Sequence, residues 1–126
     1  MGIFRRSKAS SHPLAETAVW IVPLHIKAGV EQLPAPLIGA HVQVFCRGDN
    51  ASLAAWAAIQ AIEAMGFSVP ENPTTVHQMP AAQYETYVSE NWSELRASLP
   101  SQAEFYEKIT KNQAVIGPFA GYDTAA

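Results

Sequence analysis

The side chains best suited to chemistry in this chain are three histidines in strand-like segments, His25, His41 and His77. Two imidazoles could meet on one face of a sheet if their strands were neighbours. Protein metal sites, however, are usually marked by close ligand spacing, and no HxH, HxxxH or Cys/His cluster is present. An outward strand face accounts for His41 without a metal. We therefore expect no metal site and no cofactor.

The single cysteine, Cys46, is not expected to be a nucleophile. It alternates with Ala40, Val42 and Val44 on the apolar side of a predicted strand, which indicates a small buried hydrophobic residue. A Cys–His or Ser–His nucleophile needs an adjacent base and an oxyanion hole, and no GxSxG motif occurs. The glycines of residues 117–121 (GPFAG) precede neither a lysine nor a helix start, so they do not indicate a phosphate-binding loop.

The element around which the chain is organised is a predicted helix over residues 49–66. Asp49 and Asn50 are favourable N-caps, and Gly66 suits the left-handed position that ends a helix. Seven alanines lie between them without Gly or Pro, in agreement with helix propensity. At about 100° per residue, the face predicted to pack on a sheet comprises Ala54, Ala58, Ala61, Ile62 and Met65.

Trp56 breaks this amphipathic pattern, because it projects on the polar side with Gln60 and Glu63, and Ile59 lies beside it. In one interpretation another segment, such as the connection over residues 27–39, covers the indole, since aromatic residues are mostly buried. In the second, an exposed Trp56/Ile59 patch is a partner or dimer surface. A ligand-stacking role is a third interpretation.

The remaining segments predict strands and helices in the order ββαβααβ. Strands are expected at residues 17–26, 40–47, 67–79 and 113–116; the third has two strand-like runs, 67–69 and 74–78, split by a PENP turn or bulge. Further helices are expected at 80–99, with a kink near 91–93, and at 101–111. This order predicts an α+β two-layer sandwich with a four- or five-stranded sheet and helices on one face. It is partly similar to ferredoxin-like architecture, although the strand pair here precedes the first helix; such an analogy carries no function.

The connection over residues 27–39 is longer than a normal hairpin loop. It contains Gly29, Pro34, Pro36 and Gly39, with a short helix predicted around residues 30–33. Long loops are often functional, so it is either a lid or partner contact or a structural flap over the core. Pro23, inside the first strand, lacks an N–H and is expected at an unpaired edge, a bulge or a break.

Charge divides the 126-residue chain into a basic tail, residues 1–16, expected to be disordered, and an acidic single domain, residues 17–126. The domain has 5 basic and 10 acidic residues, a net charge of −5. Such a surface disfavours nucleic acid as a partner. No apolar run approaches the ~18 residues that span a bilayer. A lone cysteine excludes an intrachain disulfide and fits a cytoplasmic location.

The leading functional hypothesis is a small cytosolic protein-interaction or regulatory domain of immunity or adaptor type, without a catalytic signature. Its partner would be a second copy of the chain or a basic protein. The interaction residues would be Trp56, Ile59 and Glu63, or a series of acidic helix residues: Glu85, Glu90 and Glu94, followed by Glu104 and Glu107. In the alternative interpretation the acidic residues are an ordinary solvated helix face. The alternative is a small α+β enzyme or small-molecule-binding protein with a site between the sheet and the 27–39 loop, using His25, His41 and Tyr122.

Overall fold

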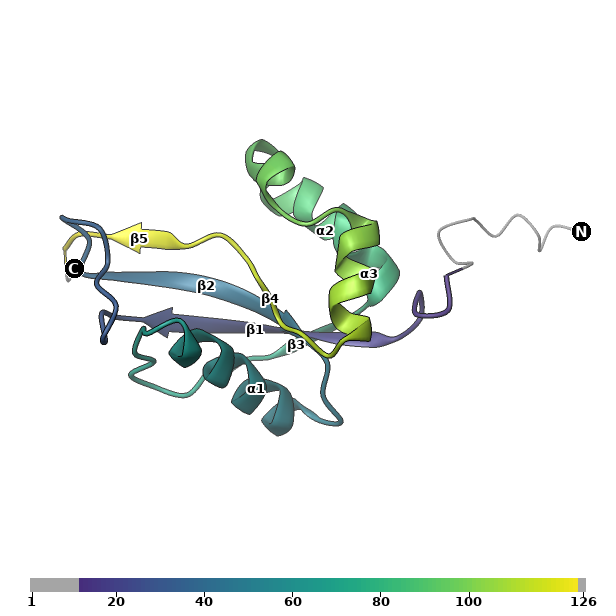
Figure 1. Cartoon of the computed structure of the whole chain (residues 1–126), viewed down its shortest axis with the longest axis horizontal. Coiled ribbons are helices and arrows are strands. Elements are labelled where there is room, and N and C mark those ends of the chain that lie inside the picture. The colour runs from purple at the N-terminus through teal and green to yellow at the C-terminus, as the bar shows by residue number, and fades with distance from the viewer. Residues whose placement is uncertain (1–11, 125–126) are drawn as a thin grey trace, which may run out of the picture.

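A long antiparallel strand pair, β1 (Ala18–Ile26) and β2 (Gly39–Cys46), forms the centre of the fold (Figure 1). The computed structural model describes residues 12–124. A short strand, β3 (His77–Pro80), lies beside β1, and β4 (Val115–Ile116) and β5 (Ala120–Tyr122) pair with opposite ends of β2. All pairings are antiparallel. The predicted α+β class is therefore confirmed, and the sheet has five strands, within the predicted four or five. Residues 67–69 contribute only an isolated bridge, Ser68 to Lys27, and the fifth strand is β5, which was not among the predicted strands.

Helices cover both faces of this sheet, which corrects the prediction of helices on one face. Helix α1 (Ala51–Ala64) packs on one face, and α2 (Tyr84–Asn91) and α3 (Gln102–Thr110) pack on the other (Figure 1). The reason lies in β1, whose two sides are both apolar: Val22 and Leu24 face α1, whereas Val19 and Ile21 face the aromatic residues of α2 and α3. The ferredoxin-like order is not confirmed.

The ends of α1 form as the sequence predicts. The side chain of Asn50 accepts a hydrogen bond from the Leu53 N–H at 2.9 Å, and Gly66 has a φ of +96°, in the left-handed region. Three of the five residues predicted to pack on the sheet are fully buried: Ala54, Ala58 and Ile62. Ala61 is half-buried. Met65 is 44% exposed because it is the C-cap, beyond the last packed turn.

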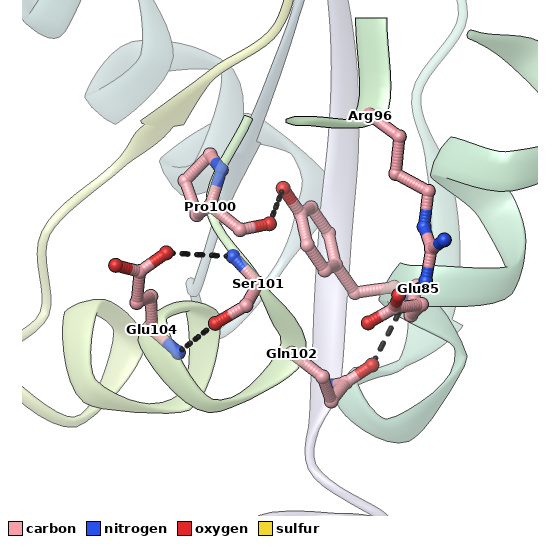
Figure 2. A network of polar contacts seen from close by, with 7 residues as sticks. Glu85, Arg96, Pro100, Ser101, Gln102 and Glu104 are labelled. Atoms are coloured by element: carbon pink, nitrogen blue, oxygen red, sulfur yellow. Dashed lines mark hydrogen bonds and ion pairs between the residues drawn. The ribbon is translucent and has the colours of Figure 1, made fainter. Parts of the chain in front are cut away.

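The predicted kink separates α2 from a 3₁₀ helix, η4 (Ser93–Ser98), and another 3₁₀ turn, η3 (Ala81–Gln83), precedes α2. Trp92 interrupts the helix with φ −141° and ψ 50°. The predicted capping box of α3 is present: the Ser101 N–H donates to Glu104 Oε1 at 2.8 Å, and the Glu104 N–H donates to Ser101 Oγ at 3.1 Å (Figure 2). The Glu85 N–H donates to Gln102 Oε1, which joins α2 to α3 (Figure 2).

No helix forms at residues 30–33, contrary to prediction; the connection between β1 and β2 is irregular. It is fixed near the C-terminal end of α1, where Lys27 bridges to Ser68 and the Glu31 N–H donates to the Gly66 carbonyl at 2.9 Å. β3 pairs with β1 only over residues 18–21. At Pro23 the edge of β1 that faces away from β2 is therefore unpaired. This agrees with the prediction for a residue that lacks an N–H.

The folded part begins before the predicted domain boundary at residue 17. Residues 12–16 form turns, and Ala15 is buried, with its carbonyl accepting a hydrogen bond from the Ala82 N–H at 3.0 Å. Leu14 packs against the cluster under α2 and α3. Two apolar residues next to the first strand thus have a place in the core. Residues 1–11 of the predicted tail lie outside the described residues.

Candidate functional site

The strand register brings together the three residues predicted for the alternative pocket. His25 on β1 lies directly opposite His41 on β2, and their rings stack with centroids 5.0 Å apart. The Tyr122 ring lies 5.7 Å from His25 and 5.6 Å from His41. Tyr122 pairs opposite Gly39, where a Cβ would overlap its ring. These residues form an aromatic cluster, hereafter the histidine cluster, beyond the region that α2 and α3 cover.

His25 links a carboxylate to the phenol through its two ring nitrogens. Nδ1 lies 3.2 Å from Glu71 Oε1, and Nε2 lies 2.5 Å from Tyr122 Oη. An ionised carboxylate can only accept hydrogen bonds, so Nδ1 must carry the proton and donate to Glu71. In a neutral imidazole Nε2 is then the acceptor, and the Tyr122 hydroxyl donates to it. Glu71 thus fixes the tautomer of His25.

Glu71 is the member of this arrangement that sequence reasoning missed. It lies in the irregular segment between α1 and β3, within a PENP sequence that indicates only a turn. A turn residue has no periodicity that predicts the direction of its side chain. The only available signal was that an acidic residue interrupts an otherwise uncharged segment, over residues 64–84.

The two histidines of the cluster line a surface hollow of about 440 Å³. Its other lining residues include Pro23, Trp92 and Pro118, together with Gln43, Glu71 and residues 72–75. The hollow therefore opens beside the 71–75 segment, whereas the sequence analysis expected a site between the sheet and the 27–39 loop, none of whose residues lines the hollow. Surface hollows of similar size lie over η4 and α3 and near the start of α1, without a histidine among their lining residues.

The outer face of α1 is the second candidate surface. Trp56 is 62% exposed and Leu53, one turn earlier, is 50% exposed. The interpretation that another segment covers Trp56 is therefore wrong, because the 27–38 connection is fixed near the opposite end of α1. Ile59 is half-buried, and Glu63 is exposed. Trp56 and Leu53, flanked by the side chains of Gln60 and Glu63, constitute the α1 surface.

The acidic helix residues do not form one free negative surface. Glu85 makes an ion pair with Arg96 (Figure 2), and Glu104 is used in the capping box of α3. Glu90 and Glu94 are exposed. An ion pair and a helix cap thus account for two residues that the sequence pattern grouped with the others.

Cys46 is buried, as predicted. It is 4% exposed, and its thiol donates to the Ala54 carbonyl at 3.3 Å. Burial raises the pKa of the Cys46 thiol to about 11, because the charged thiolate is disfavoured away from water. A thiol with that pKa has little thiolate at neutral pH, which is the reactive form.

Across residues 12–124, every helix is too short or too polar to cross a membrane. Comparison of the chain with protein families, curated proteins and solved structures finds no match. The arguments about function therefore rest on the two surfaces described above.

Proposed function

We propose that this chain is a small cytoplasmic protein-interaction domain, of the immunity or adaptor type, that binds through the α1 surface. The observation that carries the proposal is the 62% exposure of Trp56 beside the half-exposed Leu53. Tryptophan is enriched among residues that dominate binding energy in interfaces. A capped helix packed on a sheet presents both side chains at fixed positions, which lowers the entropy cost of association.

The first partner to be tested is a second copy of the chain. Glu63 is the only charged residue within α1, so a two-fold pairing of the α1 surface brings few like charges together. In such an isologous interface the same patch meets itself, and two Trp56 side chains would lie near the symmetry axis. A basic protein would instead be attracted by exposed carboxylates such as Glu90 and Glu94.

Sedimentation equilibrium on the wild type, Trp56→Ala and Gln60→Ala tests this proposal. We expect a wild-type dimer and a dissociation constant at least tenfold higher in Trp56→Ala. Gln60→Ala is the control: it removes a polar side chain one turn further along the same face and should change the dissociation constant little. The free energy of unfolding of the monomer should hardly change in Trp56→Ala, since the indole is mostly in solvent already.

Two outcomes would contradict the proposal. A monomeric wild type over the whole concentration range would exclude self-association. A loss of ~3 kcal/mol or more in the stability of monomeric Trp56→Ala would show that the indole belongs to the core.

A second candidate function, a small α+β enzyme or small-molecule-binding protein, is favoured by one observation. His25 and His41, from neighbouring strands, both line one hollow. Tyr122 contacts both histidine rings, and Glu71 orients His25. Convergent polar groups beside apolar walls are typical of ligand sites.

A further inference from the structure

We propose that the α1 surface binds a second copy of the chain by mutual insertion, in which Trp56 of each copy enters a hollow beside Trp56 of the other. The inference rests on the proposed function and deepens it, because it names where the indole lies in the partner. The hollow, hereafter the β1–α1 hollow, has a volume of about 590 Å³. Its lining includes residues from the start of β1, the turn before α1 and the first turns of α1.

The β1–α1 hollow exists because α1 covers β1 only from Trp20 onward. Ala18 and Trp20 are two residues apart and therefore lie on the same side of β1. Trp20 packs against the core under α1, whereas Ala18 is exposed. The sheet surface at Ala18 is thus open to solvent, and Leu53 and Trp56 of α1 line the same hollow.

The lining of the hollow favours an uncharged, largely apolar side chain. Ala18, Gly48 and Ala57 present little bulk, and the formal charges are those of Arg47 and Asp49, which have opposite signs. A charged group that entered the hollow would be attracted by one of them and repelled by the other. An indole instead buries apolar area, and the carboxylate of Asp49 is an available acceptor for its N–H.

A second copy of the chain supplies such a side chain beside the hollow that can receive it. Trp56 is 62% exposed and also lines the hollow, so one patch carries both the projecting indole and the hollow. A two-fold axis next to Trp56 satisfies both at once, because in an isologous interface each copy gives and receives the same contact. The two indoles would meet near the axis, where an offset or edge-to-face arrangement is favourable.

The charges and apolar residues of α1 are compatible with this pairing. Residues 17–126 have a net charge of −5, so two copies repel least where the facing surfaces carry few carboxylates, and Glu63 is the only charged residue within α1. If the helices cross antiparallel at Trp56, residues three positions before and after it come opposite each other. Leu53 of one copy, which is 50% exposed, then contacts Ile59 of the other.

Filling the hollow tests the insertion without changing Trp56. We expect Ala18→Trp to raise the dimer dissociation constant at least tenfold in sedimentation equilibrium, because the new indole occupies the space that Trp56 of the partner requires. Ala18 is exposed and tryptophan is favourable in strands, so the variant should remain folded. Ala103→Trp is the matched control: it adds the same side chain at an exposed position of α3 and should leave the dissociation constant unchanged.

An NMR measurement on the wild type locates the indole directly. The sample is an equimolar mixture of isotope-labelled and unlabelled chains at a concentration where the dimer predominates. We expect intermolecular NOEs from the Trp56 indole protons of one copy to the methyl groups of Ala18 and Ala57 of the other. A contact of Trp56 with the outer side of α1 alone would give no intermolecular NOE to Ala18.

The outcomes separate this inference from the proposed function. A dimer that is lost in Trp56→Ala but retained in Ala18→Trp keeps the α1 surface as the interface and overturns only the insertion. The insertion is also overturned if the NOEs to Ala18 come from residues 1–11 of the same chain. A monomeric wild type overturns both the insertion and self-association. Circular dichroism checks that each variant is folded, and if Ala18→Trp is not, the NOEs of the wild type decide.

Discussion

At the scale of single residues, the candidate site depends on side chains that the sequence keeps far apart. His25 and Tyr122 are separated by 97 positions, and His25 faces His41 only because of the β1–β2 register. The sequence predicts that both histidines lie in strands. It could not predict that they are opposite, because the connection over residues 27–38 is too long for turn geometry to fix the register.

Cys46 shows the opposite case, because strict alternation in its strand predicted burial correctly. The raised pKa of its thiol, about 11, gives a prediction for reactivity. At pH 8 the native thiol should react with Ellman's reagent at least a hundredfold more slowly than the thiol of the denatured chain. Rapid stoichiometric labelling of the native protein would show that Cys46 is accessible.

The same shift predicts a pH dependence of stability. Since the pKa is higher in the folded state, the favourable contribution of the neutral thiol is fully present below the ordinary cysteine value, about 8.5. It is lost as pH rises through about 11. The free energy of unfolding of the wild type should therefore fall more steeply over this window than that of Cys46→Ala, whose buried position carries no titrating group.

At the scale of elements, signals at helix ends predicted more than signals within loops. Asn50 and Gly66 predicted the limits of α1 closely, and Ser101 with Glu104 predicted the start of α3. The helix predicted at residues 30–33 does not form, because one turn between Gly29 and Pro34 offers few hydrogen bonds to offset the entropy cost of nucleation.

The N-cap of α1 provides a test at this scale. Asn50→Ala removes the acceptor of the Leu53 N–H and should lower the free energy of unfolding by about 1 kcal/mol, as measured by urea denaturation. Ser52→Ala is the matched control, since Ser52 is exposed in the same first turn and alanine has the higher helix propensity. Equal stability of wild type and Asn50→Ala would show that the cap contributes nothing.

At the scale of the whole molecule, one sheet carries two cores. Periodicity predicted which sides of β2 are apolar, but it does not specify which helix covers each side. The prediction of a two-layer sandwich is wrong for this reason, because α2 and α3 cover the second face and bury Phe45. The Phe45 ring makes edge-to-face contacts with Tyr84, Tyr87, Trp92 and Phe105. The adjacent residue Val44 belongs to the core under α1.

Because β1 and β2 contribute to both cores, we expect the domain to unfold as one cooperative unit. Trp20 packs against the core under α1, and Trp92 packs against the core under α2 and α3. Variants that retain only one of these tryptophans, with Phe at the other tryptophan positions, would report on one core each. Within each variant, denaturation curves from fluorescence and far-ultraviolet circular dichroism should coincide.

A fluorescence transition that precedes the loss of secondary structure in one variant only would contradict this expectation. It would show that the core reported by that tryptophan opens before the sheet does.

The two-sided use of β2 also constrains which length changes the chain can tolerate. Its odd-numbered positions serve one layer and its even-numbered positions the other, as Phe45 and Val44 show. Inserting one amino acid after His41 would exchange the two sets, placing Gln43 under α1 and Val44 among the aromatic rings. An insertion in the irregular, exposed stretch around Val30 would leave this alternation intact. Viable length variants should therefore be confined to such connections and excluded from the central strands.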